Sequence, residues 1–201
     1  MGSNFGDDLD ALDSVHVIIH DCDGDGIEDV VAIATGLAAD ANMNGIPDTC
    51  ETTVVCVPLA NSTGVPTLLT GTMGSGTGSG LHLEATSGPP AQFGYFLIGT
   101  GVTAPGLAIG SGVLCLDTSP GSMLGRYNAA GTVMNSIGIF DGFGVLQNGV
   151  GTSLVGSGFD VPATIPTIGG LITVGSTWHF QLWHRDIPST SNFSNAISVT
   201  F

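Results

Sequence analysis

The chain has 201 residues and a formal net charge of −15, because 17 Asp and Glu residues are balanced by only two basic residues, both Arg. Such a polyanion repels phosphate backbones and anionic lipid surfaces, so nucleic acid and acidic membranes are excluded as partners. No apolar run approaches the roughly 18 residues of a membrane span. The length allows one good core and one small appendage. Charge divides them, since 12 of the acidic residues lie in residues 1–51.

Residues 1–20 form an N-terminal segment that ends in a β-strand candidate. Residues 15–20 are rich in β-branched side chains and have no hairpin partner beside them. An apolar strand with open edges is adhesive. It must therefore pair with the body of its own chain, with a domain upstream, or with a neighbouring molecule, in which case it is a candidate for strand exchange between subunits.

Residues 40–51 match the 12-position pattern of a calcium-binding loop. Oxygen-bearing side chains fill positions 1, 3, 5, 9 and 12, and a backbone carbonyl fills position 7: Asp40, Asn42, Asn44, Asp48, Glu51 and Ile46. Ca²⁺ takes six to eight oxygen ligands, and Gly45 at position 6 lets the chain fold sharply around the ion. Every ligand position of this loop is filled, with Asp48 acting directly or through water.

Residues 21–32 match the same pattern less completely. The predicted ligands are four carboxylates and one carbonyl: Asp21, Asp23, Asp25, Asp29 and Ile27. Position 12 is Ala32, so Glu28, water or a residue from elsewhere completes the shell, or this site is the weaker. Solvated turns rich in Asp, Asn and Gly are the alternative. A position-by-position match that occurs twice within residues 21–51 favours two Ca²⁺ sites, of which the second is the better defined.

The rest of the chain predicts one short helix and then a β-rich domain. Residues 29–37 suit a helix that begins on a loop carboxylate and stops near Gly36. Residues 52–58 read as a linker. Predicted strands are residues 67–70, 81–86, 93–98, 112–116, 134–140, 171–174, 178–184 and 196–201. The expected fold is mainly β, an antiparallel β-sandwich over residues 54–201, preceded by a calcium-loop module over residues 21–53.

Four cysteines without a close Cys-x-x-Cys pair predict two disulfides and an extracellular or cell-surface location. Of the three connectivities, we favour Cys22 with Cys50, which clips the two loops together. Cys56 with Cys115 then ties the start of the sandwich to its interior. Two glycosylation sequons begin at Asn61 and Asn192, but such triplets are common by chance.

The loop pair resembles dockerin-like and thrombospondin type 3-like calcium repeats. Together with the aromatic stretches at residues 92–96 and 178–186, it resembles the C-terminal region of large exported bacterial surface proteins. In those relatives both loops carry cysteine at positions 2 and 11. Here Val31 and Ala41 replace two of the four, which supports a bridge between the surviving Cys22 and Cys50. The resemblance implies an architecture and no defined activity.

No catalytic motif stands out. No Gly-x-Ser-x-Gly elbow or His-Glu-x-x-His motif is present, and His179 and His184 are predicted to face opposite sides of one strand. We therefore expect a non-enzymatic secreted structural protein that binds calcium and pairs with itself or another surface protein, with fibre assembly as one outcome. The alternative is a carbohydrate-binding or dockerin-type docking module, in which Trp183 contacts a glycan. Arg185 and Asp186 are expected to form a structural ion pair or a turn contact.

Overall fold

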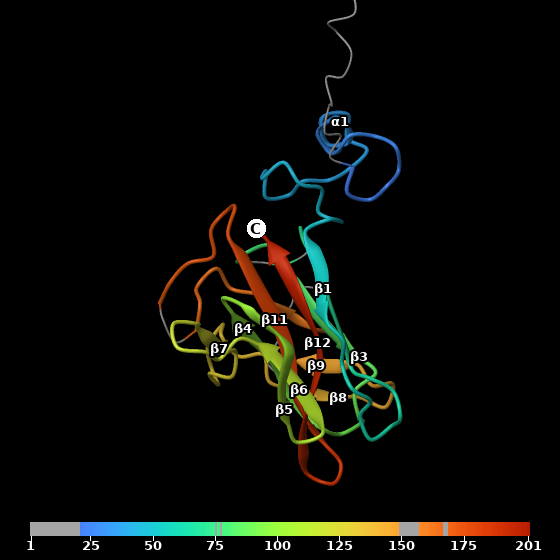
Figure 1. Ribbon diagram of the computed structural model, residues 1–201, viewed down its shortest axis with the longest axis vertical. Coiled ribbons are helices and arrows are strands. Elements are labelled where there is room, and N and C mark those ends of the chain that lie inside the picture. The colour runs from blue at the N-terminus through green and yellow to red at the C-terminus, as the bar shows by residue number, and fades with distance from the viewer. Residues whose placement is uncertain (1–20, 75, 77, 149–156, 167–168) are drawn as a thin grey trace, which may run out of the picture.

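The computed structural model describes residues 21–74, 76, 78–148, 157–166 and 169–201. The predicted strand at residues 15–20, like the rest of the N-terminal segment, lies outside the described residues. A small module, residues 21–51, sits at one end of a larger β-body (Figure 1). The module holds α1 (Asp29–Ala34), and the chain leaves this helix through Gly36 at a φ of +74°, as expected. Among the described residues, no helix is long and apolar enough to cross a membrane.

The β-body contains twelve strands within the described residues. In chain order they are β1 (Thr52–Cys56), β2 (Leu68–Thr72), β3 (His82–Thr86), β4 (Phe93–Gly99), β5 (Val102–Ile109), β6 (Gly112–Leu116), β7 (Leu124–Arg126), β8 (Gly138–Phe140), β9 (Leu146–Asn148), β10 (Phe159–Asp160), β11 (Thr177–Asp186) and β12 (Thr190–Thr200).

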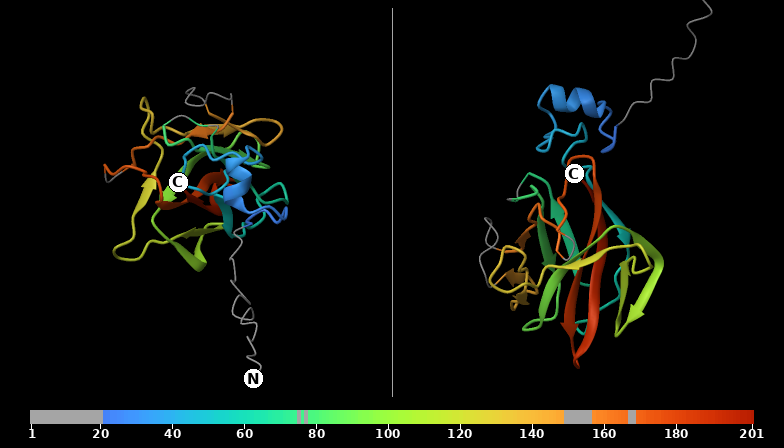
Figure 2. Two further views of the ribbon diagram at one scale, coloured as in Figure 1. Left: turned by 90° about the horizontal axis from the view of Figure 1, so that it is seen from above. Right: turned by 90° about the vertical axis from the view of Figure 1, so that its left-hand side faces the viewer.

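These strands form three antiparallel sheets. The largest has seven strands in the order β1-β12-β11-β4-β8-β9, with β7 also paired to β4. A three-stranded sheet has the order β10-β3-β2, and β5 and β6 form a separate hairpin. The long strands β11 and β12 run the length of the body beneath the module (Figures 1 and 2). The expected fold class, an antiparallel β-sandwich with one short helix before it, is confirmed.

The seven-stranded sheet is covered on both faces because apolar side chains alternate along its central strands. Phe96 and Ile98 of β4 join the main core under the three-stranded sheet, with Phe180 of β11. Leu97, between them in sequence, points to the other face and packs with Leu114 of the β5–β6 hairpin. The fold is therefore a two-sheet sandwich with a hairpin laid on its outer face.

Two buried amide side chains join the outer layers to the central sheet. Asn195 accepts the N–H of Leu69 at 2.7 Å and donates to the carbonyl of the same residue at 2.9 Å. On the other face, Gln181 accepts from Cys115 N–H at 2.9 Å and donates to the carbonyl of Val113 at 2.9 Å. Each amide imitates a strand neighbour, so a buried backbone edge is satisfied without a ladder.

Both predicted disulfides are present. Cys22 and Cys50 have Cα atoms 6.0 Å apart, and Cys56 on β1 joins Cys115 on β6 across 6.3 Å. No cysteine is free. Two disulfides indicate that the protein matures in an oxidising environment.

Neither sequon presents its asparagine to solvent. Asn61 is 6% exposed and donates to Thr67 Oγ1 and to the carbonyl of Ser87, while Asn192 is fully buried and donates to Asp186. A glycan cannot be accommodated on either side chain in the folded protein. Both asparagines instead make buried hydrogen bonds to other parts of the chain.

Several predicted elements were wrong. Residues 52–58 do not form a linker, because β1 (Thr52–Cys56) pairs with β12 along the sheet. Residues 171–174 make only an isolated bridge from Leu171 to Thr164, and residues 134–140 keep only the β8 portion. The strands β5, β7, β9 and β10 were missed. Pro105 and Gly106 argue against a strand in β5, and the other three have only two or three residues, too few for periodicity to register.

Candidate metal centre

The two acidic loops have the same backbone geometry. In each, the carboxylate at position 1 accepts N–H bonds from positions 5 and 6, and the carboxylate at position 9 accepts one from position 2. In the first loop, the backbone N–H groups of Asp25 and Gly26 donate to the Asp21 carboxylate at 3.2 and 2.9 Å, and the N–H of Cys22 donates to the Asp29 carboxylate at 3.0 Å. In the second loop, the backbone N–H groups of Asn44 and Gly45 donate to the Asp40 carboxylate at 3.1 and 2.9 Å, and the N–H of Ala41 donates to the Asp48 carboxylate at 2.8 Å. The predicted repeat is thus a structural repeat.

The same two loop positions turn through the left-handed region. Position 6 is Gly26 at a φ of +88° in the first loop and Gly45 at +85° in the second. Position 4 is Gly24 at +75° in the first loop, but Met43 at +58° in the second. A side chain rarely adopts such a φ. The second loop therefore keeps the common backbone path in spite of its sequence.

The first loop gathers three carboxylates. Oxygens of Asp21, Asp23 and Asp25 lie within 4.8 Å of one another on an exposed turn. Ala32 is buried in α1 and has no side-chain oxygen, and Glu28 does not belong to this group of neighbouring carboxylates. The residue that would complete this shell is therefore absent from the gathered set.

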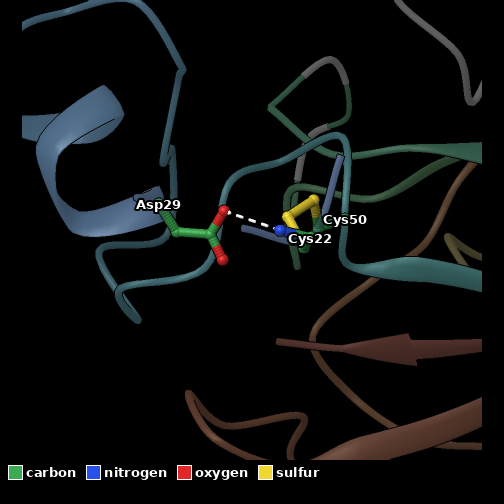
Figure 3. A group of neighbouring side chains, drawn as sticks. All are labelled: Cys22, Asp29 and Cys50. Carbon is green, nitrogen blue, oxygen red and sulfur yellow. Dashed lines mark hydrogen bonds between the residues drawn. A yellow bond between two sulfur atoms is a disulfide. The ribbon is translucent and has the colours of Figure 1, made fainter. Parts of the chain in front are cut away.

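Asp29 has a structural partner as well. It is 8% exposed, and its carboxylate accepts the Cys22 amide beside the Cys22–Cys50 disulfide (Figure 3). The two sulfur atoms are bonded to each other, so they cannot act as thiolate ligands. This side chain fixes the position of Cys22 at the start of the first loop.

The second loop is closed by a buried carboxylate. Glu51 is 3% exposed, and its Oε1 accepts hydrogen bonds from Asn42 Nδ2 at 2.7 Å and Asn44 Nδ2 at 2.8 Å. Its Oε2 is buried without a hydrogen-bond partner among the described residues. Burial is the main cause that raises the pKa of this carboxyl above its ordinary value of 4.5, and the charges of Asp48 and Asp40 add to it.

One feature of this loop, the unpartnered Oε2 of Glu51, suits a hard cation. A buried carboxylate oxygen without a partner is costly, and a divalent ion bound by oxygen atoms would satisfy it. Position 12 of a calcium loop supplies such a carboxylate, facing side-chain oxygens from positions 1, 3 and 5. In the structure, the amide nitrogens of Asn42 and Asn44 face the Glu51 carboxylate, while their Oδ1 atoms accept backbone N–H groups. The full oxygen shell of the second site therefore stays a prediction.

The second loop is also attached to the sandwich. The amide of Thr200, the last residue of β12, donates to the carbonyl of Glu51 at 3.1 Å. A Cβ placed on Gly74, just after β2, would lie 3.0 Å from Ala41 Cβ and 3.2 Å from Asp48 Oδ2. A side chain at residue 74 would therefore require the neighbouring loop atoms to shift by a few tenths of an ångström. The second loop thus packs against the end of both sheets.

Trp183 lies in an aromatic cluster on the outer face of the central sheet. Its ring is 4.9 Å from Tyr95 and 5.5 Å from Phe93, and the Arg185 guanidinium lies 5.8 Å above it. Arg185 donates to the carbonyl of Ser189, so it makes a turn contact, and no ion pair with the adjacent aspartate is found among the described residues. A cavity of about 240 Å³ beside Trp183 is also lined by Arg126.

The histidines divide as expected, and one has an unexpected partner. His184 is buried in contact with Thr67 Oγ1, and burial lowers its pKa, whereas His179 points to the opposite face and is partly exposed. His82 Nδ1 lies 2.8 Å from Asp160 Oδ1 in a buried pair that joins β3 to β10. Sequence reasoning missed this pair because 78 residues separate the two side chains.

The chain matches no protein-family model, no curated protein and no solved structure.

Proposed function

We propose that the protein is a non-enzymatic, extracellular structural protein in which Ca²⁺ rigidifies the junction between the loop module and the β-sandwich. The observation that carries this proposal is Glu51. Its buried side chain closes the second loop, and its carbonyl belongs to the sheet ladder. An ion held by that carboxylate would act directly on the start of β1.

Charge gives the ion a second role. The first loop places three carboxylates within 4.8 Å, and like charges at this separation repel. Asp21, Asp23 and Asp25 would hold one Ca²⁺, while Asp40, Asn42, Asn44, Ile46, Asp48 and Glu51 would hold the other. Neutralised in this way, the acidic module becomes a stiff spacer suited to cell-surface attachment, a matrix or a fibre.

The proposal is tested by thermal unfolding of the full chain after chelation with EGTA and after calcium is restored. A ligand that binds only the folded state stabilises it by about 2.7 kcal/mol at a concentration of 100 Kd. We expect the melting temperature to fall on chelation and to recover with Ca²⁺. An unchanged melting curve after verified metal removal would count against the proposal.

A second candidate function is glycan binding at Trp183. It is favoured by one observation: both arginines of the chain border this aromatic cluster, Arg185 above the ring and Arg126 in the adjoining cavity. Aromatic faces flanked by polar cations suit a sugar ring that carries an acidic group. A glycan array should then show binding that Trp183→Ala abolishes and that Phe143→Ala, at a 92% exposed ring elsewhere, leaves intact.

A further inference from the structure

One edge of the seven-stranded sheet has no neighbour among the described residues. β1 stands at the end of the strand order and pairs only with β12. The Thr200 amide bonds to the Glu51 carbonyl, and hydrogen-bonded pairs alternate along an antiparallel ladder. The amides of Thr52 and Val54 therefore point away from β12. The outer side of β1 presents backbone groups that another strand could use.

This edge is apolar as well as open. Val54 is 65% exposed and Val57 80% exposed, with Val55 between them at 38%. Edge strands of soluble proteins are usually protected by charge, proline, a bulge or a covering segment. β1 carries neither charge nor proline, and its one register shift, between Val54 and Cys56, leaves the regular pairing of residues 52–54 intact. Such an edge is the expected acceptor of an additional strand.

Cavities lie on both sides of the same strand. One of about 420 Å³ separates β1 from β2 and is lined by Val54, Leu69 and Ile197. Another of about 400 Å³ separates β1 from the β5–β6 hairpin and is lined by Val55 and Pro105. A strand added at the edge would place alternate side chains toward each of these spaces.

We propose that residues 15–20 of the same chain form this strand and pair antiparallel with the outer edge of β1. The segment is apolar and β-branched, and its sequence gives it no hairpin partner of its own. It is also the right length, because six extended residues span about 20 Å, close to the length of β1.

The Cys22–Cys50 disulfide explains why the strand comes from its own chain. It holds the Cα of Cys22 6.0 Å from that of Cys50, two residues before β1 begins (Figure 3). Traced backward from Cys22, residues 20 to 15 then run alongside residues 52 to 57. A short tether of this kind gives the segment a millimolar effective concentration that a neighbouring molecule does not match. This proposal does not depend on calcium occupancy, so it can fail or hold independently of the proposed function.

The test measures hydrogen exchange of the β1 amides in the full chain, with NMR as the method of detection. The Val54 amide should be protected, although it points away from β12. Ile18→Pro removes a donor from the added strand and should speed Val54 exchange by about tenfold or more. The Thr53 amide, which points to β12, is the internal control. Leu12→Pro, in the same N-terminal segment but before the strand, is the matched variant and should change neither amide.

Two results would overturn the proposal. One is equal, fast exchange of Val54 in the wild-type chain and in Ile18→Pro. The other is protection that appears only in oligomers and disappears on dilution to monomer, measured on the same samples by light scattering. That second result would assign the strand to a neighbouring copy. Protection that is retained in the monomer and lost in Ile18→Pro supports the assignment.

Discussion

The carbonyl of Glu51 accepts a hydrogen bond from the amide of Thr200 at 3.1 Å, while the Glu51 side chain closes the second acidic loop. One residue therefore belongs both to the candidate calcium site and to the last rung of the β1–β12 ladder. Movement of the loop cannot occur at this point without movement of the sheet edge. If this loop holds Ca²⁺ as proposed, metal binding would be coupled to the orientation of the module through this residue.

Glu51→Gln is expected to weaken calcium binding at the second loop by more than about tenfold, because it removes the charged ligand at position 12. The variant keeps the size of the side chain and its ability to hydrogen-bond. Calorimetric titration measures the affinity. Glu28→Gln, which removes one charge from the same module without touching this loop, should leave the affinity of the second site within about twofold of wild type. An equal loss of calcium affinity in both variants would mean that the net charge of the module, and not ligation by Glu51, accounts for the effect.

Calcium affinity at the second loop should fall as the pH is lowered toward the raised pKa of Glu51. Burial raises this pKa above 4.5, so protons begin to compete with the ion at a higher pH than they would at an exposed carboxylate. In the absence of metal, the pH dependence of folding stability at this residue has the opposite sign to that of calcium affinity. Between 4.5 and the raised pKa the folded state binds more protons than the unfolded state, so stability falls as the pH rises through that window.

Calcium titrations at a series of pH values check the first statement, and unfolding of the metal-free protein at the same pH values checks the second. Glu51→Gln lacks the titrating group and should flatten both dependences. A metal-free wild-type protein whose stability rises with pH across the same window, by an amount that Glu51→Gln abolishes, would contradict the sign.

Gly45→Ala should destabilise the second loop by about 1–2 kcal/mol, because residue 45 sits at a φ of +85° that a side chain disfavours. No heavy atom lies within 4 Å of a Cβ at this position, so a steric clash is not the cause. Gly142→Ala is the matched control, since its Cβ is equally unobstructed and its φ lies outside that region. Chemical unfolding in the presence of Ca²⁺ should separate the two variants. Equal behaviour would mean that the loop does not keep this turn in solution.

Asn195→Ala should cost about 3 kcal/mol or more, because it leaves the buried N–H and carbonyl of Leu69 without partners. Asn128→Ala, at an exposed asparagine, should change the free energy of unfolding by no more than about 0.5 kcal/mol. Urea unfolding of both variants measures the difference. A small cost at Asn195 would show that water or a shifted strand takes the place of the amide.

The sequence predicted the local features of this protein and missed those that depend on contacts between distant segments. The acidic loops, the short helix and the main strands such as β4 and β11 follow from spacing and alternation within a few residues. The two disulfides followed from cysteine number and loop position. By contrast, residues 52–58 were predicted to be a linker, because the partner of β1 is β12, a strand at the other end of the β-domain sequence.

The same limit applies to the site. Position matching selected Glu51 as a ligand, but its burial comes from packing that no local pattern encodes. Asn61 and Asn192 match glycosylation sequons, triplets that carry little weight on their own, and the structure shows that their side chains make hydrogen bonds in the interior. The role of a buried polar side chain of this kind depends on its hydrogen-bond partner. Asn192 and its partner Asp186 are brought together only by the pairing of β11 with β12.

Calorimetric titration of the fully decalcified chain with Ca²⁺ tests the central claim most directly. We predict saturable binding at two sites, with the tighter one weakened by more than about tenfold in Glu51→Gln and kept within about twofold of wild type in Glu28→Gln. A titration that shows no heat above dilution up to millimolar Ca²⁺, on protein verified to be folded and free of metal, would contradict the account.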